Sequence, residues 1–208
     1  MSCFIIAECG VNWRDLVDAD DMIRETAKAG ADACKFQAYN TDFSPITHPR
    51  YRELNAIRLD ESTVRYLYWR CQQHRIEFMC TPMYPEAVAM LDPYVKRWKV
   101  RYADRDNEAI LGPCRATGKP MLVSGKNLFC ISEYPPGIPT NISCTISEPL
   151  IGISSHFPQI LAQYGHPKTE YLEVHVRLDC YEPHYCPIDC AVSITMSELA
   201  ELCRRLKK

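Results

Sequence analysis

Short apolar runs alternate with helical patterns from the start of the chain. Residues 4–8 form a nearly continuous apolar run, typical of a buried strand. Residues 19–29 follow with apolar positions at helical spacing, and Gly30 comes next, a residue that commonly ends helices. Residues 33–37 form a second strand-like run, and residues 64–71 carry apolar side chains at i, i+3, i+4 and i+7. This alternation favours parallel βα units over a sandwich or a helical bundle.

The same alternation continues to the C-terminus, with one irregularity. Further strands are expected at residues 78–81, 97–101, 121–124, 128–132, 150–154 and 172–177, and helices at 85–91, 107–117, 160–164 and after Thr195, which has capping-box spacing to Glu198. Between 121–124 and 128–132 there is no room for a crossover helix. Residues 135–149 contain four prolines and are expected to be a loop. The pattern predicts an α/β fold, a shortened (β/α)8 TIM-type barrel without the helix after its fifth strand.

Composition restricts the class of ligand. The 208 residues, of which 47% are apolar, are enough for one sizeable core, so residues 1–208 are interpreted as a single domain. The formal net charge of −2 offers no polycation for a nucleic-acid backbone or a membrane surface, which favours a small molecule. No run of about 18 apolar residues and no signal-peptide pattern is found, so we expect a cytoplasmic protein without a membrane span.

Twelve cysteines are many for this length, and in a secreted protein they would indicate a disulfide framework. Cys34, Cys80 and Cys130 fall inside apolar runs, where a reduced thiol serves as a small hydrophobe, and we favour reduced thiols. A local cluster could instead hold zinc, although its spacing matches no standard pattern and an ordinary loop is favoured. The cluster consists of Cys180, His184, Cys186 and Cys190.

Polar side chains end or follow most of the expected strands. In barrels of parallel strands the functional residues lie at these C-terminal ends, so a shared rim is expected. Ammonium and hydroxyl groups suit a phosphate or carboxylate, and two histidines on neighbouring strands suit a divalent metal with open positions. Glu8 and Asp189 are candidate general bases or metal-linked carboxylates. A structural layer of salt bridges is the alternative. The rim residues are Glu8, Lys35, Gln37, Lys99, Ser124, Ser132, Ser154, His156 and His175.

Two separated segments carry a family resemblance. Residues 4–12 read Phe-Ile-Ile-Ala-Glu-Cys-Gly-Val-Asn, and residues 29–37 read Ala-Gly-Ala-Asp-Ala-Cys-Lys-Phe-Gln. Further matching segments lie at 80–82, 117–120, 130–135, 152–156, 173–175, 189–193 and 198–199. Over essentially its whole length the chain resembles the N-acetylneuraminate (sialic acid) synthase family. It matches the barrel domain only, in shortened form, and we expect no C-terminal antifreeze-like domain.

The resemblance implies a transferase that condenses phosphoenolpyruvate with an amino-sugar or aldose aldehyde similar to N-acetylmannosamine. The products would be a nonulosonic, sialic-type acid and phosphate. It also implies a divalent metal, Mn²⁺ with Mg²⁺ or Co²⁺ as alternatives, held by His156 and His175. Phosphoenolpyruvate would be bound by Lys35, Lys99, Ser124 and Ser154. Glu8 would manage a water or its proton, and Asp189 a metal-linked water or a sugar hydroxyl. Weaker candidates for substrate contact are Gln37, Asp104, Asn107, Ser132 and Tyr134.

Four positions depart from the family pattern. Trp13 stands where the family has His, Ser155 where it has Asp, Tyr102 where it has Ser and Ser132 where it has Asn. Without a lid domain, a homodimer or a partner chain is expected to cover the site. The competing interpretations are a degenerate barrel that binds or scaffolds without catalysis, and another aldolase-like or lyase reaction on the same barrel.

Overall fold

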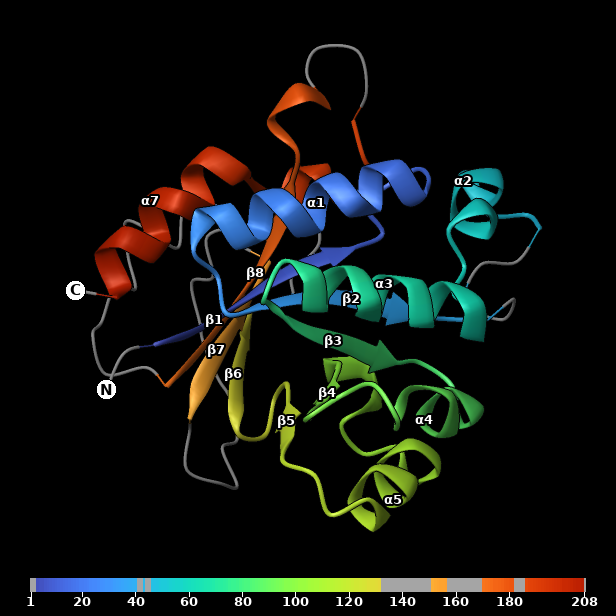
Figure 1. Cartoon of the computed structure of the whole chain (residues 1–208). Helices are drawn as coiled ribbons and strands as arrows, with labels where there is room; N and C mark the ends of the chain where they lie inside the picture. The colour runs from blue at the N-terminus through green and yellow to red at the C-terminus, as the bar shows by residue number, and fades with distance from the viewer. Residues whose placement is uncertain are drawn as a thin grey trace.

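The computed structural model describes residues 3–40, 43, 46–131, 151–156, 170–181 and 186–207. Within these ranges the strands are parallel and follow the chain around a curled sheet, which confirms the shortened (β/α)8 barrel (Figure 1). The interpretation of residues 1–208 as one domain stays a prediction. The barrel strands are β1 Phe4–Gly10, β2 Ala33–Ala38, β3 Glu77–Pro82, β4 Trp98–Val100, β5 Met121–Val123, β6 Leu128–Ile131, β7 Gly152–Ser155 and β8 Tyr171–Arg177.

Strand pairing follows the order β3-β2-β1-β8-β7-β6 in one sheet, while β4 pairs with β5. The two parts meet where Ser124, after β5, bridges to Leu128 at the start of β6, and where β4 packs beside β3. A short further strand, β9 Ser193–Thr195, pairs with the last residues of β8. The C-terminal ends of the strands therefore surround one opening.

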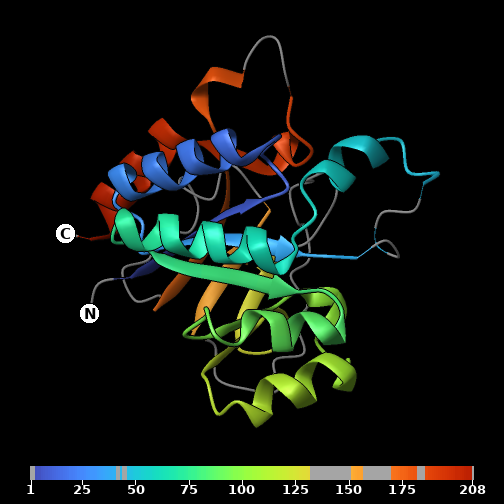
Figure 2. The ribbon, with the colours of Figure 1, turned by 45° about the vertical axis from the view of Figure 1, so that its right-hand side comes forward.

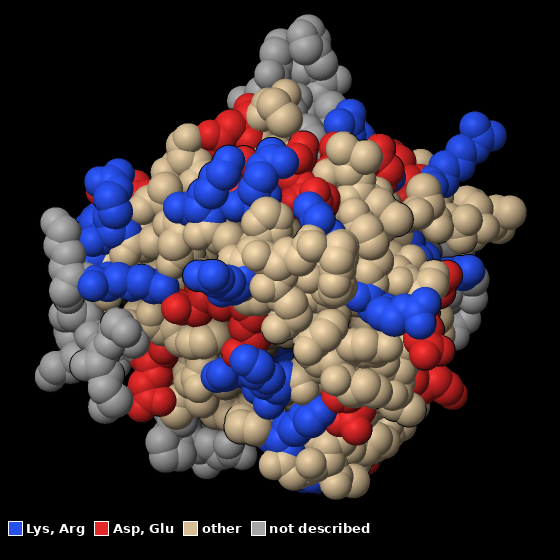
Figure 3. All heavy atoms as spheres, in the orientation of Figure 1, with Lys and Arg blue, Asp and Glu red and all other residues tan. Residues whose placement is uncertain are grey.

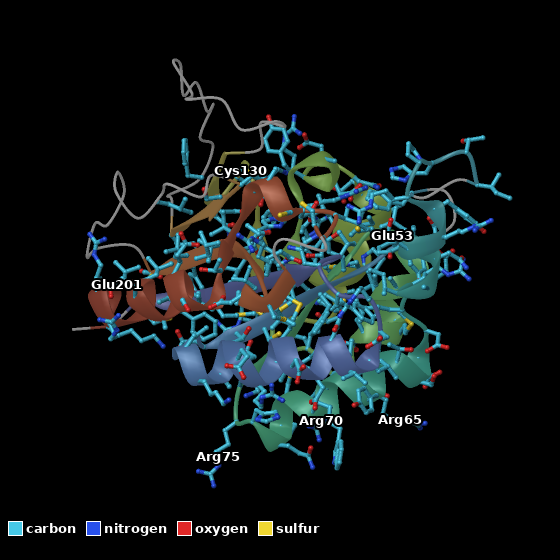
Figure 4. The ribbon with its side chains drawn as sticks, turned by 90° about the horizontal axis from the view of Figure 1, so that it is seen from above. Glu53, Arg65, Arg70, Arg75, Cys130 and Glu201 are labelled. Atoms are coloured by element: carbon cyan, nitrogen blue, oxygen red, sulfur yellow. The ribbon has the colours of Figure 1, made fainter. Side chains whose placement is uncertain are left out.

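Helices cover the outside of this sheet. They are α1 Leu16–Ala29, α2 Tyr51–Ala56, α3 Glu61–Gln73, α4 Pro85–Leu91, α5 Glu108–Ala116 and α7 Met196–Leu206, with 3-10 turns η1 Tyr102–Asp104, η2 Asp179–Tyr181 and η3 Cys190–Val192. Helix α1 lies beside α7 and α3 (Figure 2). Seen from above, the labelled Arg65, Arg70 and Arg75 extend outward from α3 and its C-terminal end (Figure 4). The helices thus turn apolar faces to the strands and charged faces to water.

Local signals explain where the helices begin and end. Helix α1 starts where the Asp15 carboxylate accepts hydrogen bonds from the N–H groups of Val17 and Asp18. It ends at Gly30, whose φ of 89° is left-handed. The predicted capping box of Thr195 and Glu198 opens α7. Helix α2 lies between the expected strand at 33–37 and the expected helix at 64–71, where the sequence pattern predicted no element.

The alternation along each strand produces two apolar layers. Outward-facing residues pack against α1, α3, α4 and α7 in the main core. Inward-facing residues from five strands form a floor inside the barrel, made of Ile6, Ala33, Met79, Leu122 and Leu128. Because side chains on one face of a strand recur every second residue, the next inward positions lie directly above this floor.

The connection from β5 to β6 shows how the barrel manages without a fifth helix. The side chain of Asn127 behaves like a strand residue beside β5, since its Oδ1 accepts the N–H of Val123 at 2.7 Å and its Nδ2 donates to the carbonyl of Met121 at 2.9 Å. Gly125 turns the chain with φ of +82°, and a Cβ there would lie 2.6 Å from the Tyr102 ring. The predicted absence of a crossover helix is confirmed.

Among the described residues on the face in Figure 3, charges of both signs occur side by side, with Lys and Arg interspersed among Asp and Glu. Among the described helices, none is long and apolar enough to cross a membrane. The expected loop at 135–149 and the helix at 160–164 lie outside the described residues.

Candidate active site

A cavity of about 410 Å³ opens at the C-terminal ends of the strands. Its walls are formed by the inward positions that follow the apolar floor, two residues further along each strand: Glu8 after Ile6, Lys35 after Ala33, Thr81 after Met79, Ser124 after Leu122 and Cys130 after Leu128. The rest of the lining comes from Gln37, Phe43, Met83, Lys99, Arg101, Tyr102, Ala103, Ser154, His156, Glu173, His175 and Asp189. The period-two pattern therefore places polar side chains from distant segments in one opening.

Four buried charged residues form a network in the cavity. Lys35 contacts the Glu8 carboxylate and lies 3.6 Å from Oε2 of Glu173. Nζ of Lys99 lies 3.0 Å from Oε1 of the same Glu173. All four side chains are 5% exposed or less. Two lysines thus balance two glutamates, and Glu173 lies between the lysines.

The network shifts the pKa values of two of its members. Burial opposes ionisation of Glu173, but the charges of Lys35 and Lys99, with hydrogen bonds from Lys99 and Ser154, outweigh it and hold its pKa well below the ordinary value. Burial lowers the pKa of Lys35 to about 8, and the charge of Lys99 adds to this effect while Glu173 opposes it. Glu173 is therefore a firmly ionised carboxylate between two cations.

Hydroxyl groups complete the polar wall. Lys35 donates to Thr81 at 2.7 Å, Lys99 donates to Ser124 at 2.8 Å, and Ser154 donates to Glu173 at 2.8 Å. Ammonium and hydroxyl groups side by side provide the donors that a phosphate or carboxylate requires. The wall is suited to an anion.

Close packing fixes Glu8 at the end of β1. Nε2 of Gln37 donates to Oε1 of Glu8 at 3.3 Å. Gly10 has φ of +48°, and a Cβ there would lie 2.8 Å from the same oxygen. Glycine at this position therefore leaves the room that the Glu8 carboxylate occupies.

Two imidazole rings lie next to one another in the cavity wall. The ring centroids of His156 and His175 are 4.5 Å apart. Nδ1 of His175 is buried without hydrogen-bond geometry, at 3.4 Å from Oδ2 of Asp189. Two imidazole side chains, one of them beside a carboxylate, fit a divalent metal that keeps open positions. No group of three or more His, Cys, Asp or Glu arranged for a metal occurs among the described residues.

Asn12 holds the segment that carries Asp189. Its Oδ1 accepts the N–H of Asp189 at 2.8 Å, and its Nδ2 donates to Val176 O at 2.9 Å and to Ser193 Oγ at 2.8 Å. Ser193 in turn donates to the carbonyl of Asp189 at 2.7 Å. One fully buried amide thus ties the ends of β1 and β8 to the loop before β9.

The structure brings together most of the predicted site residues. Glu8, Lys35, Gln37, Lys99, Ser124, Ser154, His156, His175 and Asp189 all line the cavity. Asp104 and Asn107 do not, because Asp104 pairs with Arg101 and Asn107 caps α5 through the N–H of Ala109. Ser132 and Tyr134 lie outside the described residues.

Two of the departures from the family pattern lie away from the cavity. Trp13 is buried and donates to the carbonyl of Gly10 at 3.0 Å, and Ser155 is buried beside the lining residue Ser154. Tyr102 does line the cavity, with the guanidinium of Arg105 4.0 Å from its ring centroid. These three positions therefore lie behind the cavity lining or at the rim of the cavity, and outside the network of buried charges.

Four residues with roles at this site were not predicted from the sequence. Glu173 and Thr81 lie inside segments that carried the resemblance, and Asn12 ends the first of them. Glu173 and Thr81 could have been predicted from strand register, because both occupy inward-facing positions like that of Lys35. Arg101 follows β4 and also lines the cavity.

The cysteines do not contribute a second centre among the described residues. Eleven of them are free thiols, and Cys34 and Cys80 are fully buried. Of the four residues that could hold zinc but were expected to form an ordinary loop, Cys180 and Cys186 are exposed and Cys190 is half-buried, while His184 lies outside the described residues.

The fold and the cavity define a TIM-type barrel protein with a polar cavity, lined by buried lysines and hydroxyl groups, at the C-terminal ends of its strands. A model of the NeuB family matches residues 22–126, about half of the chain, so the protein belongs to the NeuB family. The chain is 30% identical over 141 residues to the N,N'-diacetyllegionaminic acid synthase of Legionella pneumophila, covering 60% of this chain and 40% of that one. It is 32% identical over 124 residues to an uncharacterized protein of Methanocaldococcus jannaschii, covering 58% and 37%.

A solved structure supports the same fold. The N-acetylneuraminic acid (sialic acid) synthetase of Leptospira borgpetersenii, solved with citrate, matches with a TM-score of 0.77 at 23% identity. The match covers 99% of this chain and 83% of that one. By contrast, the chain spans less than half the length of the two curated relatives above.

Proposed function

We propose that the cavity binds phosphoenolpyruvate and condenses it with the aldehyde of an amino sugar or related aldose, giving a sialic-type acid and phosphate. The observation that carries the proposal is the convergence of two buried lysines and an imidazole pair in one cavity. Membership of the NeuB family and the similarity to a legionaminic acid synthase support it. The chain spans only part of the length of its curated relatives, so this activity is proposed and does not follow from the similarity alone.

Lys35 and Lys99 would bind the anionic groups of phosphoenolpyruvate. Each ammonium has three N–H donors, and Lys99 directs donors to Glu173 and Ser124. Glu173 keeps both lysines in place while Ser154 holds Glu173. The substrate would therefore meet fixed donors with little reorganisation.

The imidazole pair would hold the metal, Mn²⁺ with Mg²⁺ or Co²⁺ as alternatives. Such an ion would supply Lewis acidity toward the aldehyde carbonyl. Asp189 beside Nδ1 of His175 favours the tautomer that leaves Nε2 as the donor to a metal.

The bond changes balance without a redox partner. C3 of phosphoenolpyruvate forms a bond to the aldehyde carbon, water adds to C2, and phosphate leaves by cleavage of its C–O bond. Glu8, held by Lys35 and Gln37, is the proposed acceptor of the proton from this water.

The test is phosphate release from phosphoenolpyruvate with Mn²⁺, using N-acetylmannosamine and related aldoses against a chelator control. We expect sugar-dependent, chelator-sensitive release, and Lys99→Met should lower kcat/KM for phosphoenolpyruvate by about 100-fold. Lys96→Met, an exposed lysine three residues earlier, is the matched control. No release with any sugar from a folded protein would favour the binding or scaffold alternative.

A further inference from the structure

The cavity contains a third cation that differs in depth from the two lysines. The side chain of Arg101, directly after β4, is 34% exposed, whereas those of Lys35 and Lys99 are 3% exposed. It lines the opening together with Phe43 and Tyr102, which are 42% and 40% exposed. Arg101 therefore lies at the mouth, above the buried charge network.

Arg101 is anchored through one edge of its guanidinium. Its Nε donates to Oδ2 of Asp104, and Oδ1 of Asp104 accepts a hydrogen bond from Asn107 at 3.3 Å. The guanidinium also lies 5.6 Å from the ring centroid of Phe43. Asp104 and Asn107 thus act behind the cavity wall, as the support of a residue that lines it.

The other edge of the guanidinium has no partner among the described residues. Within the part of the chain that the structure describes, Nη1 and Nη2 of Arg101 make no hydrogen bond. A planar fork with unused N–H groups matches the two oxygens of a phosphate or carboxylate. The buried lysines differ, because Glu8 and Glu173 already balance them.

We propose that Arg101 determines acceptor specificity by binding a second anionic group, a phosphate or carboxylate, on the part of the acceptor sugar remote from its aldehyde. The identity of the ligand as an acceptor sugar rests on the proposed function. The difference in exposure between Arg101 and the two lysines supports the assignment. An anion bound to Lys35 and Lys99 would occupy the buried part of the cavity and leave its mouth to the second substrate.

Calorimetric titration tests the proposal without turnover. The probes are N-acetylmannosamine, its 6-phosphate and the corresponding 6-carboxylate, each titrated into the full chain. We expect the wild-type protein to bind at least one anionic probe about 10-fold or more tightly than the neutral sugar. Arg101→Met should abolish this preference. Arg105→Met should keep it, because Arg105 is in the same loop and contacts Tyr102 but does not line the cavity.

Kinetics separate this proposal from the proposed function. Arg101→Met should raise KM for the anionic acceptor and leave KM for phosphoenolpyruvate unchanged. Equal wild-type affinity for neutral and anionic probes, or a preference that survives Arg101→Met, would overturn the assignment, as would a rise confined to KM for phosphoenolpyruvate. If no acceptor supports phosphate release, the proposed function fails, while the titration still decides the role of Arg101.

Discussion

Glu173 is the carboxylate through which the two buried lysines share one counter-charge. Glu173→Gln keeps the shape of the side chain but leaves Lys35 and Lys99 buried with Glu8 as the remaining anion. Removing one member of a buried ion network leaves an uncompensated charge. We therefore expect the free energy of unfolding at pH 7 to fall by about 3 kcal/mol, measured by urea denaturation.

The stabilisation by Glu173 depends on pH. Because the pKa of Glu173 is lowered in the folded state, its stabilisation is present above its ordinary value of 4.5 and is lost as pH falls below it. The wild-type and variant proteins should therefore converge in acid. Glu25→Gln, in a surface pair with Lys28, is the control and should cost about 1 kcal/mol or less. Equal losses in the two variants would refute the network's role.

Asn12 is expected to act on the proposed metal site through Asp189. Asn12→Ala removes three hydrogen bonds that fix the loop beside His175. Loss of such support typically weakens metal binding 10- to 100-fold, so we expect the Kd for Mn²⁺ to rise by about 10-fold in a titration. Asn55→Ala, an exposed asparagine in α2, should leave it unchanged. An unchanged Kd in a folded Asn12→Ala protein would contradict the positioning role.

Single residues differ in how well the sequence predicts them. Lys35 and Lys99 could be found because a lysine inside an apolar strand has few places to point except a polar cavity. Glu173 lies in an equally apolar run, but its meaning depends on two lysines from distant strands, which no local pattern connects. Asp104 and Asn107 were predicted as substrate contacts, and the sequence could not show that Arg101 stands between them and the cavity.

At the scale of elements, Asn127 replaces part of a strand. Asn127→Ala would remove the side-chain amide that pairs with two backbone groups of β5, the N–H of Val123 and the carbonyl of Met121. Each unmade buried hydrogen bond costs about 1–3 kcal/mol, so the free energy of unfolding should fall by about 2 kcal/mol or more. Urea denaturation with Asn55→Ala as the reference variant checks this. A loss no larger than that of Asn55→Ala would show that water replaces the amide.

Elements with strong local signals were predicted correctly. Helix α7 was found from its capping box, and α1 from its apolar spacing and Gly30. Helix α2 was missed because it has six residues, one buried side chain and no side-chain cap, so its stability comes from packing that a pattern does not reveal.

At the scale of the whole molecule, the barrel could be predicted because every strand obeys the same rule. Parallel order and period-two alternation together decide which residues face inward, and therefore which ones share the cavity. Closure between β5 and β6 could not be predicted, since it depends on one side-chain amide and one left-handed glycine.

The burial of thiol and phenol side chains predicts how the stability of the whole fold responds to alkaline pH. Burial raises the pKa of Cys3, Cys114 and Cys203 from 9.0 to about 11 and that of Cys80 to about 12, and it also raises those of Cys34 and Tyr39. Such groups stabilise the fold below their unfolded pKa, and this stability is lost as pH rises through the folded value. Lys35 acts oppositely, because its lowered pKa relieves a penalty as pH rises from about 8 towards 10.5.

Burial also raises the pKa of Tyr84, so among the described residues the thiols and phenols with a raised pKa outnumber Lys35 and decide the direction. The urea midpoint, measured in the presence of reductant, should fall between pH 9 and 11, because each thiol in its window contributes a slope of up to about 1.4 kcal/mol per pH unit. Cys203→Ala should make the decline shallower, since it removes one such group, whereas Lys35→Met should make it steeper. A midpoint that stays level or rises over this range would show that the buried thiols ionise as easily in the folded chain as in the unfolded one.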